Sequence, residues 1–406
     1  MAVSEVRLGT TTATPARTLA WPLTRLDVAG AFGDIGVLFP IAIALITLNH
    51  LNPTAVFLAA GLTYVLAGWY FQIPISVQPL KAVAAIALAM GLSPSAIASA
   101  GVLMGILLAI IAITNTAALL AKLFTLPIVR GIQLGLGLLL AREGLRLILG
   151  RQSILALSNG ASLTGWEIAL GVAILLLGFH KSTRYPAALV LLTVGIALGL
   201  LMQWGKIPQF VWGPLPLQFL HPRADEFWRV LPLLVIPQFA LTFGNSIVAT
   251  ENTSQILYGP QARRVTVRAL SMSIALVNLA SGMIQAAPMC HGSGGITAHY
   301  RFGARTPKSS YIIGGLCILL ALFGRAAIGV LHLIPIAVLG VFLIYVGIQH
   351  AAYLRDIVKR VPLLLIAVCV GAVSLLTTNL MWGFLTGFAL QGILLVYERT
   401  NSARRA

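Results

Sequence analysis

The residues best suited to bind a ligand lie in one short run of this sequence, Cys290-His291-Gly292-Ser293-Gly294-Gly295. Glycines let a ligand approach the backbone with no Cβ in the way. A helix that begins in such a run points free N–H groups and the positive end of its dipole toward the ligand, which favours an anion. We therefore predict an anion-binding site whose substrate-binding residues here are His291, Gly292, Ser293 and Gly294.

A second, weaker run of this kind is Pro74-Ile75-Ser76-Val77-Gln78-Pro79. Its two prolines forbid a continuous helix, and the second fits the first turn of a helix that runs to about Met90. Ser76 and Gln78 would then lie at the start of that helix and donate hydrogen bonds into a cavity. The alternative is a re-entrant turn in which Gln78 satisfies loose backbone groups.

Both runs interrupt apolar segments, and a bilayer tolerates irregular backbone only where protein buries it or where it lines a cavity. Two interrupted hydrophobic segments in corresponding halves of a chain indicate the substrate site of a transporter.

A third group of polar residues lies between Pro237 and Ser246. Gln238, Thr242, Asn245 and Ser246 recur at about one-turn and two-turn spacing, so they share one face of a helix. Polar faces of membrane helices look toward another helix or a cavity. We predict that Gln238 and Thr242 line the pocket and that Asn245 contacts a neighbouring helix.

Asp34 and Lys81 are the ionisable residues deepest in the first half of the chain. Buried charges in a bilayer are costly and tend to pair, so one interpretation is a structural Asp34–Lys81 ion pair. The other is that Asp34 carries a proton during transport, a role that His291 could also perform. In either case Lys81 would add positive potential behind an anion.

Composition excludes a soluble protein. Of 406 residues, 58% are hydrophobic and 9% are charged, and the mean hydropathy is +0.94. Continuous apolar runs of about 20 residues, the length of a membrane-spanning helix, predict an all-α polytopic membrane protein rather than a β-barrel. The net charge of +17 is better explained by basic cytoplasmic loops than by nucleic-acid binding.

Fourteen apolar segments, two of them short, can be placed along the chain. They lie at roughly 28–49, 54–71, 79–91, 94–115, 126–149, 164–180, 185–203, 229–250, 266–286, 292–301, 309–330, 332–350, 361–378 and 380–398. If every segment crosses, 18 of the 27 basic residues fall on the side of the N-terminus. The positive-inside rule then places both termini in the cytoplasm, and the region 142–163 fits the rule least well. We expect a bacterial inner membrane.

The segments divide into two groups of seven that resemble each other. Asp34 precedes Gln78 by 44 positions, and Asn245 precedes His291 by 46. Because seven is odd, the two groups would insert in opposite directions, which is the inverted-repeat arrangement of secondary transporters. The predicted divisions are a cytoplasmic N-terminal tail (1–26), a first repeat (27–203), a connecting loop (204–228), a second repeat (229–398) and a cytoplasmic tail (399–406).

Taken together, these motifs resemble the molybdate transporter family of plants, algae and bacteria, itself similar to the sulfate permeases. The resemblance is carried by Gly33-Asp34-Ile35-Gly36, by Pro74 to Lys81, by Pro237 to Ser246, by Cys290 to Gly295 and by Tyr300 to Arg305. It implies a fold like that of the uracil transporter, with a core domain (segments 1–4 and 8–11), a gate domain (5–7 and 12–14) and half-helices at segments 3 and 10. It also implies a substrate site faced by Gln78, Gln238, Thr242, His291 and Ser293.

The predicted function is secondary active transport of a tetrahedral oxyanion, with molybdate as the first candidate, by alternating access. Two helix N-termini with neutral amides and hydroxyls can bind a dianion without holding it too tightly to leave. Gln238 stands where nucleobase-transporting relatives have an acid, which also fits an anionic substrate. The alternatives are a sulfate or other anion permease of the same fold, or an anion channel.

The sequence also bears on enzyme activity, cofactors and binding partners. No catalytic triad, metal-ligand spacing or nucleotide-binding loop occurs in the sequence, so we expect neither an enzyme nor a cofactor. The lipid bilayer is the expected surrounding. Relatives often form homodimers through the gate domain, and no sequence feature decides this point.

Overall fold

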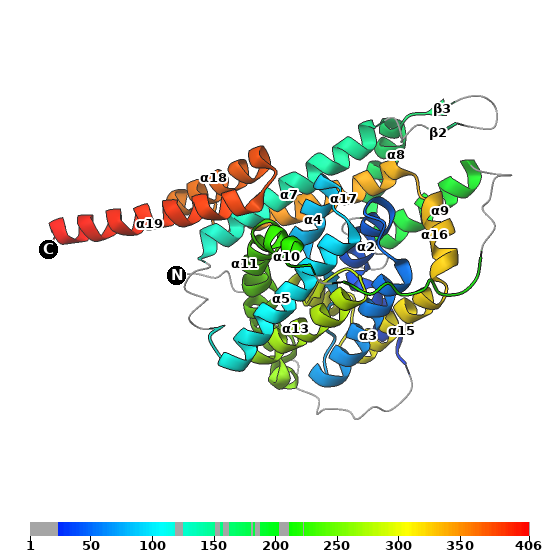
Figure 1. Ribbon diagram of the computed structural model, residues 1–406, viewed down its shortest axis with the longest axis horizontal. Helices are drawn as coiled ribbons and strands as arrows, with labels where there is room; N and C mark the ends of the chain where they lie inside the picture. Colours follow the sequence, from blue (N-terminus) through cyan, green and yellow to red (C-terminus); the bar gives the residue numbers. More distant parts are fainter. Residues whose placement is uncertain are drawn as a thin grey trace.

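The computed structural model describes residues 23–117, 125–150, 155–156, 162–179, 182, 187–202, 211–221 and 223–405. These residues form an all-helical molecule apart from two pairs of two-residue strands (Figure 1). The fold class is thus confirmed as that of an all-helical membrane protein. Most of the predicted N-terminal tail, residues 1–22, lies outside the described residues, as do residues 204–210 and 222 of the predicted connecting loop.

The helices follow one another along the whole chain. In the first half they are α1 (Arg25–Ala31), η1 (Phe32–Asp34), α2 (Ile35–Leu48), α3 (Pro53–Phe71), α4 (Lys81–Met90), α5 (Pro94–Thr114), α7 (Leu126–Leu149), α8 (Gly165–Phe179) and α9 (Ala187–Met202). In the second half they are α10 (Ala224–Val230), η3 (Leu231–Val235), α11 (Ile236–Leu241), η4 (Thr242–Val248), α12 (Ala249–Tyr258), η5 (Gly259–Arg264), α13 (Val267–Met283), α14 (Ser293–Arg301), α15 (Lys308–Leu322), α16 (Gly324–Leu333), α17 (Ile336–Ala351), η6 (Ala352–Asp356), α18 (Val361–Thr377) and α19 (Leu380–Arg405).

Several helix starts follow directly from the local sequence. The side chains of Asn52 and Ser93 accept hydrogen bonds from the first-turn amides of α3 and α5. Each of these caps is followed by a proline, which needs no hydrogen-bond acceptor at the first helical position. The N-terminal ends of α3 and α5 are therefore fixed by residues adjacent in the chain.

Among the described residues, six helices are long and apolar enough to cross a membrane, or seven if the bent pair Lys308–Leu322 and Gly324–Leu331 counts as one span. Five further apolar helices in this part of the chain have 10–17 residues, at or below the lower limit for a straight bilayer crossing. The larger number of fourteen crossing segments stays a prediction.

One predicted segment is wrong as a continuous helix. The apolar stretch 309–330 bends by 91° between α15 and α16. The loop before α10 holds this bend, because the amide of Arg325 donates to the carbonyl of Gly213 (3.0 Å) and its Nε to that of Pro214 (3.1 Å). Hydropathy alone does not reveal this contact.

Several helix pairs join the two halves of the chain, α7 with α18 among them. α3 packs along α15, α5 along α13, and α7 along α17 (Figure 1). Where α7 crosses α17, a Cβ added at Gly137 would lie 2.5 Å from the carbonyl oxygen of Gly347, and one added at Gly144 would lie 2.4 Å from that of Gly340. Glycine on both helices lets the two backbones approach closely, as at many membrane helix contacts.

Two short helices start side by side inside the molecule. The strand β1 (Gln78–Pro79) pairs antiparallel with β4 (Met289–Cys290), with Gln78 opposite Cys290. The amide of Leu80 extends the pairing by donating to the carbonyl of Pro288 (2.8 Å). α4 and α14 begin directly after these strands, so both predicted short helices are present. The strand pairing that joins them was not predicted; the second strand pair, β2 (Leu155–Ala156) with β3 (Ser162–Leu163), lies far from it along the chain.

Candidate functional site

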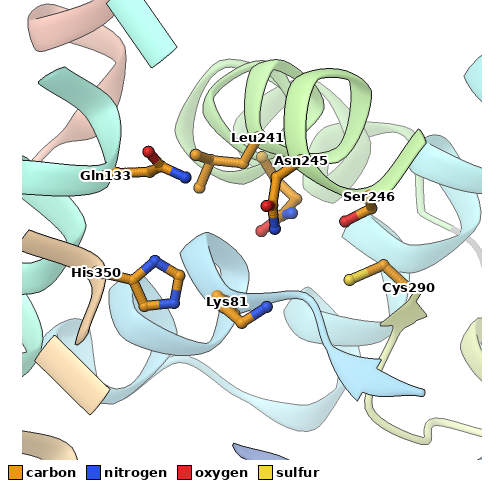
Figure 2. A pocket seen from close by; sticks show the side chains of 8 residues that line it. Lys81, Gln133, Leu241, Asn245, Ser246, Cys290 and His350 are labelled. Carbon is orange, nitrogen blue, oxygen red and sulfur yellow. The ribbon is translucent and has the colours of Figure 1, made fainter. Parts of the chain in front are cut away.

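A small cavity lies where the starts of the short helices meet α7 and α17 (Figure 2). Its first side is formed by Lys81, Gln238, Leu241, Asn245, Ser246 and Cys290. Its other side is formed by Gln133 of α7 and His350 of α17. The cavity has room for roughly one water molecule, which is less than a tetrahedral oxyanion requires. The two sides must therefore separate before such a ligand can enter.

A chain of buried polar side chains leads from this cavity into the first half of the protein. Nζ of Lys81 donates to Oε1 of Gln78 (2.6 Å). Nε2 of Gln78 donates to Oδ1 of Asp34, and the hydroxyl of Tyr64 donates to Oδ2 (2.8 Å). Asp34, Gln78 and Lys81 are all at least 90% buried.

The predicted direct ion pair between Asp34 and Lys81 is therefore wrong. The ion pairs among the described residues do not include it, because Gln78 lies between the two charges. A glutamine amide offers an acceptor on one side and donors on the other, so it can satisfy a cation and an anion at once. Gln78 thus orients Lys81 at the cavity.

Ser76 has a different position from the one predicted. Its hydroxyl donates to the carbonyl of Gly292 (2.7 Å) and accepts from the amide of the same residue (2.8 Å). Ser76 is fully buried, and its single O–H proton is committed to this contact. The hydroxyl fastens the start of α4 to the start of α14, away from the residues that line the cavity.

Replacing Ser76 with alanine is expected to lower stability rather than anion affinity. The carbonyl of Gly292 keeps its hydrogen bonds from the amides of Gly295 and Ile296. The buried amide of Gly292, however, would lose the Ser76 hydroxyl as its acceptor, at a cost of about 1–3 kcal/mol. Thermal unfolding of the purified variant should show a lower melting temperature. Ser309→Ala is the matched control, because the buried Ser309 hydroxyl has no hydrogen-bond partner among the described residues. Wild-type stability with lost molybdate affinity in Ser76→Ala would contradict this role.

His291 also faces away from the cavity. Its Nδ1 lies 2.8 Å from the carbonyl oxygen of Ser76 and its Nε2 lies 2.8 Å from Oγ of Ser273. Because a carbonyl only accepts, Nδ1 carries the proton and Nε2 accepts from the serine. Side chains alternate along a strand, so Cys290 rather than His291 turns toward the cavity. The sequence motif alone did not reveal this alternation.

The start of α14 presents free backbone donors. Within the described residues, no acceptor occupies the amides of Ser293 and Gly294, and Gly294 is exposed. Oγ of Ser293 donates to Oδ1 of Asn245 (2.9 Å). The preceding Gly292 is buried, and a Cβ there would lie 2.8 Å from Oε1 of Gln78. The prediction of an anion site at the N-terminus of this helix is therefore better supported by the backbone amides of Ser293 and Gly294 than by the side chain of His291.

The polar face of the eighth segment agrees with the prediction in part. Oε1 of Gln238 accepts from the amides of Ala82 (2.7 Å) and Val83 (3.3 Å), and its Nε2 donates to Thr242 (2.9 Å). Gln238 borders the cavity while capping α4, and Thr242 lies buried behind it. Asn245 makes the predicted contact with a neighbouring helix, because it accepts from Ser293 at the start of α14, and it also lines the cavity. The π-helical turns of η4 change the spacing of these side chains from that of a regular helix.

The cavity residues Gln133, Leu241, Cys290 and His350 were not predicted, and Ser246 was placed on the polar face of the eighth segment but not in the pocket. Gln133 is an uncharged polar residue whose nearest neighbours along α7 are apolar or glycine, and polar residues in membrane helices usually face the interior. That signal could have identified it. His350 lies near the C-terminal end of α17 and has no neighbouring motif that would distinguish it from an interfacial histidine.

Solved structures define the class of the fold. The chain is similar to the transmembrane domain of the cyanobacterial bicarbonate transporter BicA, with a TM-score of 0.63 and 17% identity, over 89% of this chain and 97% of that one. It is also similar to the murine anion transporter SLC26A9 in its inward-facing state, with a TM-score of 0.64 and 15% identity, over 93% of this chain and 70% of that one. At these identities the likeness shows the fold alone.

The sequence profile of the family described as molybdate transporter of MFS superfamily matches residues 27–140 and 231–349. This is more than half of the chain, which therefore belongs to the molybdate transporter family and is an integral membrane protein. Molybdate transporter 2 of Arabidopsis thaliana is 28% identical over 403 residues, 90% of this chain and 86% of that protein. Molybdate transporter 1 of Chlamydomonas reinhardtii is 27% identical, over 95% and 94% of the two chains.

Proposed function

We propose that this protein is a secondary active transporter that carries molybdate by alternating access, with the anion bound between the N-termini of α4 and α14. The observation that carries the proposal is the pairing of β1 with β4. It brings Lys81, at the start of α4, and the free amides of Ser293 and Gly294, at the start of α14, to one place in the molecule. The names of the relatives in plants and algae support molybdate as the substrate.

The proposed contacts suit a tetrahedral dianion. Lys81 supplies a positive charge, while the amides at the start of α14 and the side chain of Asn245 supply neutral donors. A helix N-terminus binds anions because its first amides have no acceptor within the helix. One full charge with several neutral donors attracts a dianion and still permits its release. In this assignment Gln78 and Gln238 position the donors, and Ser76, Thr242 and His291 support the surrounding backbone.

The larger architecture is part of the same proposal. Residues 27–203 and 229–398 would form two inverted repeats joined by the loop 204–228, with both tails in the cytoplasm of a bacterium. The packing of α3 on α15 and of α5 on α13 supports this. In each pair, the second long segment of one proposed repeat packs on the fourth segment of the other. The cavity lies between the proposed core elements and the proposed gate helices α7 and α17. Relative motion of the two groups would expose it to one side of the membrane at a time.

The proposal is tested by titrating purified protein with molybdate and with sulfate, followed by uptake into proteoliposomes. We expect saturable molybdate binding that excess sulfate competes for only weakly, together with slow saturable uptake. Equal affinity for sulfate would support a sulfate permease instead. Single-channel currents would support an anion channel, which the small size of the cavity disfavours. Absence of molybdate binding would contradict the proposal.

Asp34 is the proposed proton-coupling residue. It accepts from Tyr64 and Gln78, and His299 lies near enough to interact with it electrostatically. His291 is less suited to this role, because both of its ring nitrogens are engaged. Protonation of Asp34 would remove a negative charge and leave the charge of Lys81 free to attract the anion.

Molybdate uptake is accordingly expected to rise as the outside pH falls, and Asp34→Asn is expected to flatten that dependence. The asparagine side chain keeps an oxygen that can accept a hydrogen bond from Tyr64, but it does not take up a proton between pH 5 and pH 8. Initial uptake rates between pH 5 and pH 8 give the measurement, with Asp225→Asn at an exposed ion pair as the control. An unchanged pH profile in Asp34→Asn would exclude Asp34 as the coupling residue.

A further inference from the structure

Two side chains on the gate side of the cavity carry nitrogen atoms with no hydrogen-bond partner. Nε2 of Gln133 and Nδ1 of His350 are both buried and unpartnered within the described residues. Gln133 is 1% exposed and His350 is 7% exposed. A buried polar atom without a partner costs about 1–3 kcal/mol, so two of them at one cavity require an explanation.

The orientation of the Gln133 amide is fixed by its neighbour. Oε1 of Gln133 accepts from Nη1 of Arg130 (2.9 Å), which lies one turn earlier on α7. A guanidinium only donates, so the atom beside it must be the oxygen, and the NH₂ group must lie on the other side. Arg130 is itself held by Asp356 and by the ring of Tyr353. The contacts of Arg130 with Gln133, Asp356 and Tyr353 thus fix the orientation of the Gln133 NH₂ group.

His350 lies on the same side of the cavity as Gln133 (Figure 2). The picture shows its ring and the Gln133 amide facing the space between them and Lys81, Asn245 and Leu241. In the tautomer that carries its proton on the unpartnered Nδ1, the imidazole of His350 can donate from that atom to a ligand. The close glycine contacts of α7 with α17 keep these two gate residues together.

We propose that Gln133 and His350 are anion-binding residues of the gate, which donate to the transported oxyanion when the gate closes on the core. This rests on the proposed function and deepens it, since the core alone was expected to hold the substrate. Lys81, Asn245 and the start of α14 would bind one face of the tetrahedron, and the two gate donors would bind the opposite face. The anion then bridges core and gate, so gate closure is stabilised by substrate and the donors that are otherwise unpaired become satisfied.

The test measures molybdate binding to purified full-length variants by calorimetry. Gln133→Leu and His350→Leu should each weaken binding by about tenfold or more, since each removes one donor to a charged ligand. His350→Gln, which retains an N–H donor, should recover most of the affinity. Gln349→Leu is the matched control, because Gln349 is adjacent on α17 but exposed, and it should bind as the wild type does.

The outcomes separate this inference from the proposed function. If wild-type protein binds molybdate and both leucine variants bind it equally well, the gate residues are not ligands and the inference is overturned. If the wild type does not bind molybdate at all, the proposed function itself fails. The melting temperature of each variant without molybdate shows whether it is folded, and molybdate should raise the melting temperature of the wild type more than that of either leucine variant. An equal rise in all three would also overturn the inference.

Discussion

Replacing Lys81 with methionine is expected to abolish molybdate uptake. Lys81 is the only cationic side chain among the residues that line the described cavity, and it stands at the first position of α4. Loss of one partner from a buried charge pair costs about 2–5 kcal/mol, which corresponds to an affinity loss of roughly thirtyfold to several thousandfold. Binding calorimetry and uptake into proteoliposomes both measure this loss.

A folding defect must be separated from a binding defect in this experiment. Lys81→Met leaves the buried carboxylate of Asp34 with no cation at the other end of Gln78. The double variant Asp34→Asn/Lys81→Met removes both charges and should recover thermal stability without recovering molybdate binding. If the double variant binds molybdate with wild-type affinity, Lys81 is not the cation that holds the anion.

Gly295→Ala is expected to destabilise the protein and to abolish molybdate uptake. A Cβ at Gly295 would lie 2.5 Å from both Oδ1 of Asp34 and Cβ of Ser76, and 2.6 Å from Nε2 of Gln78. All three neighbours belong to the buried network that joins α4 to α14, so none of them can move without breaking a hydrogen bond. Overpacking of this kind costs about 1–3 kcal/mol before the broken bonds are counted.

The measurement is the yield and melting temperature of the purified variant, together with molybdate uptake. Gly315→Ala is the matched control, since a Cβ at Gly315 of α15 would meet no atom within 4 Å. Alanine favours a helix over glycine, so this control should be neutral or slightly stabilising. A Gly295→Ala protein with normal stability and uptake would show that the two helix starts do not pack as described.

The two short helices could be predicted because their cause is local. Prolines and glycines at 74–79 and 288–295 prevent continuous helices, and the apolar residues on either side require membrane depth. The same local reasoning led to Gln238, which lines the cavity, and to Gln78, which hydrogen-bonds the cavity residue Lys81. It also paired Asp34 directly with Lys81, and it did not foresee that Gln78 would lie between them.

The remaining errors came from information that is not local. Two-residue strands turned Cys290 toward the cavity and His291 away from it, and no hydropathy pattern predicts so short a pairing. The cavity residues Gln133 and His350 come from two helices that lie far from the short helices in sequence. Their role becomes visible only when tertiary packing brings them to one space.

The most direct test of the central claim is to locate the bound anion. Tungstate is a tetrahedral dianion of the same shape as molybdate, and its heavy atom can be located by anomalous X-ray scattering from crystals of the complex. We predict one tungstate ion between the N-termini of α4 and α14, within hydrogen-bonding distance of Nζ of Lys81 and of the amides of Ser293 and Gly294. An ion bound elsewhere, with these donors left unoccupied, would contradict the account.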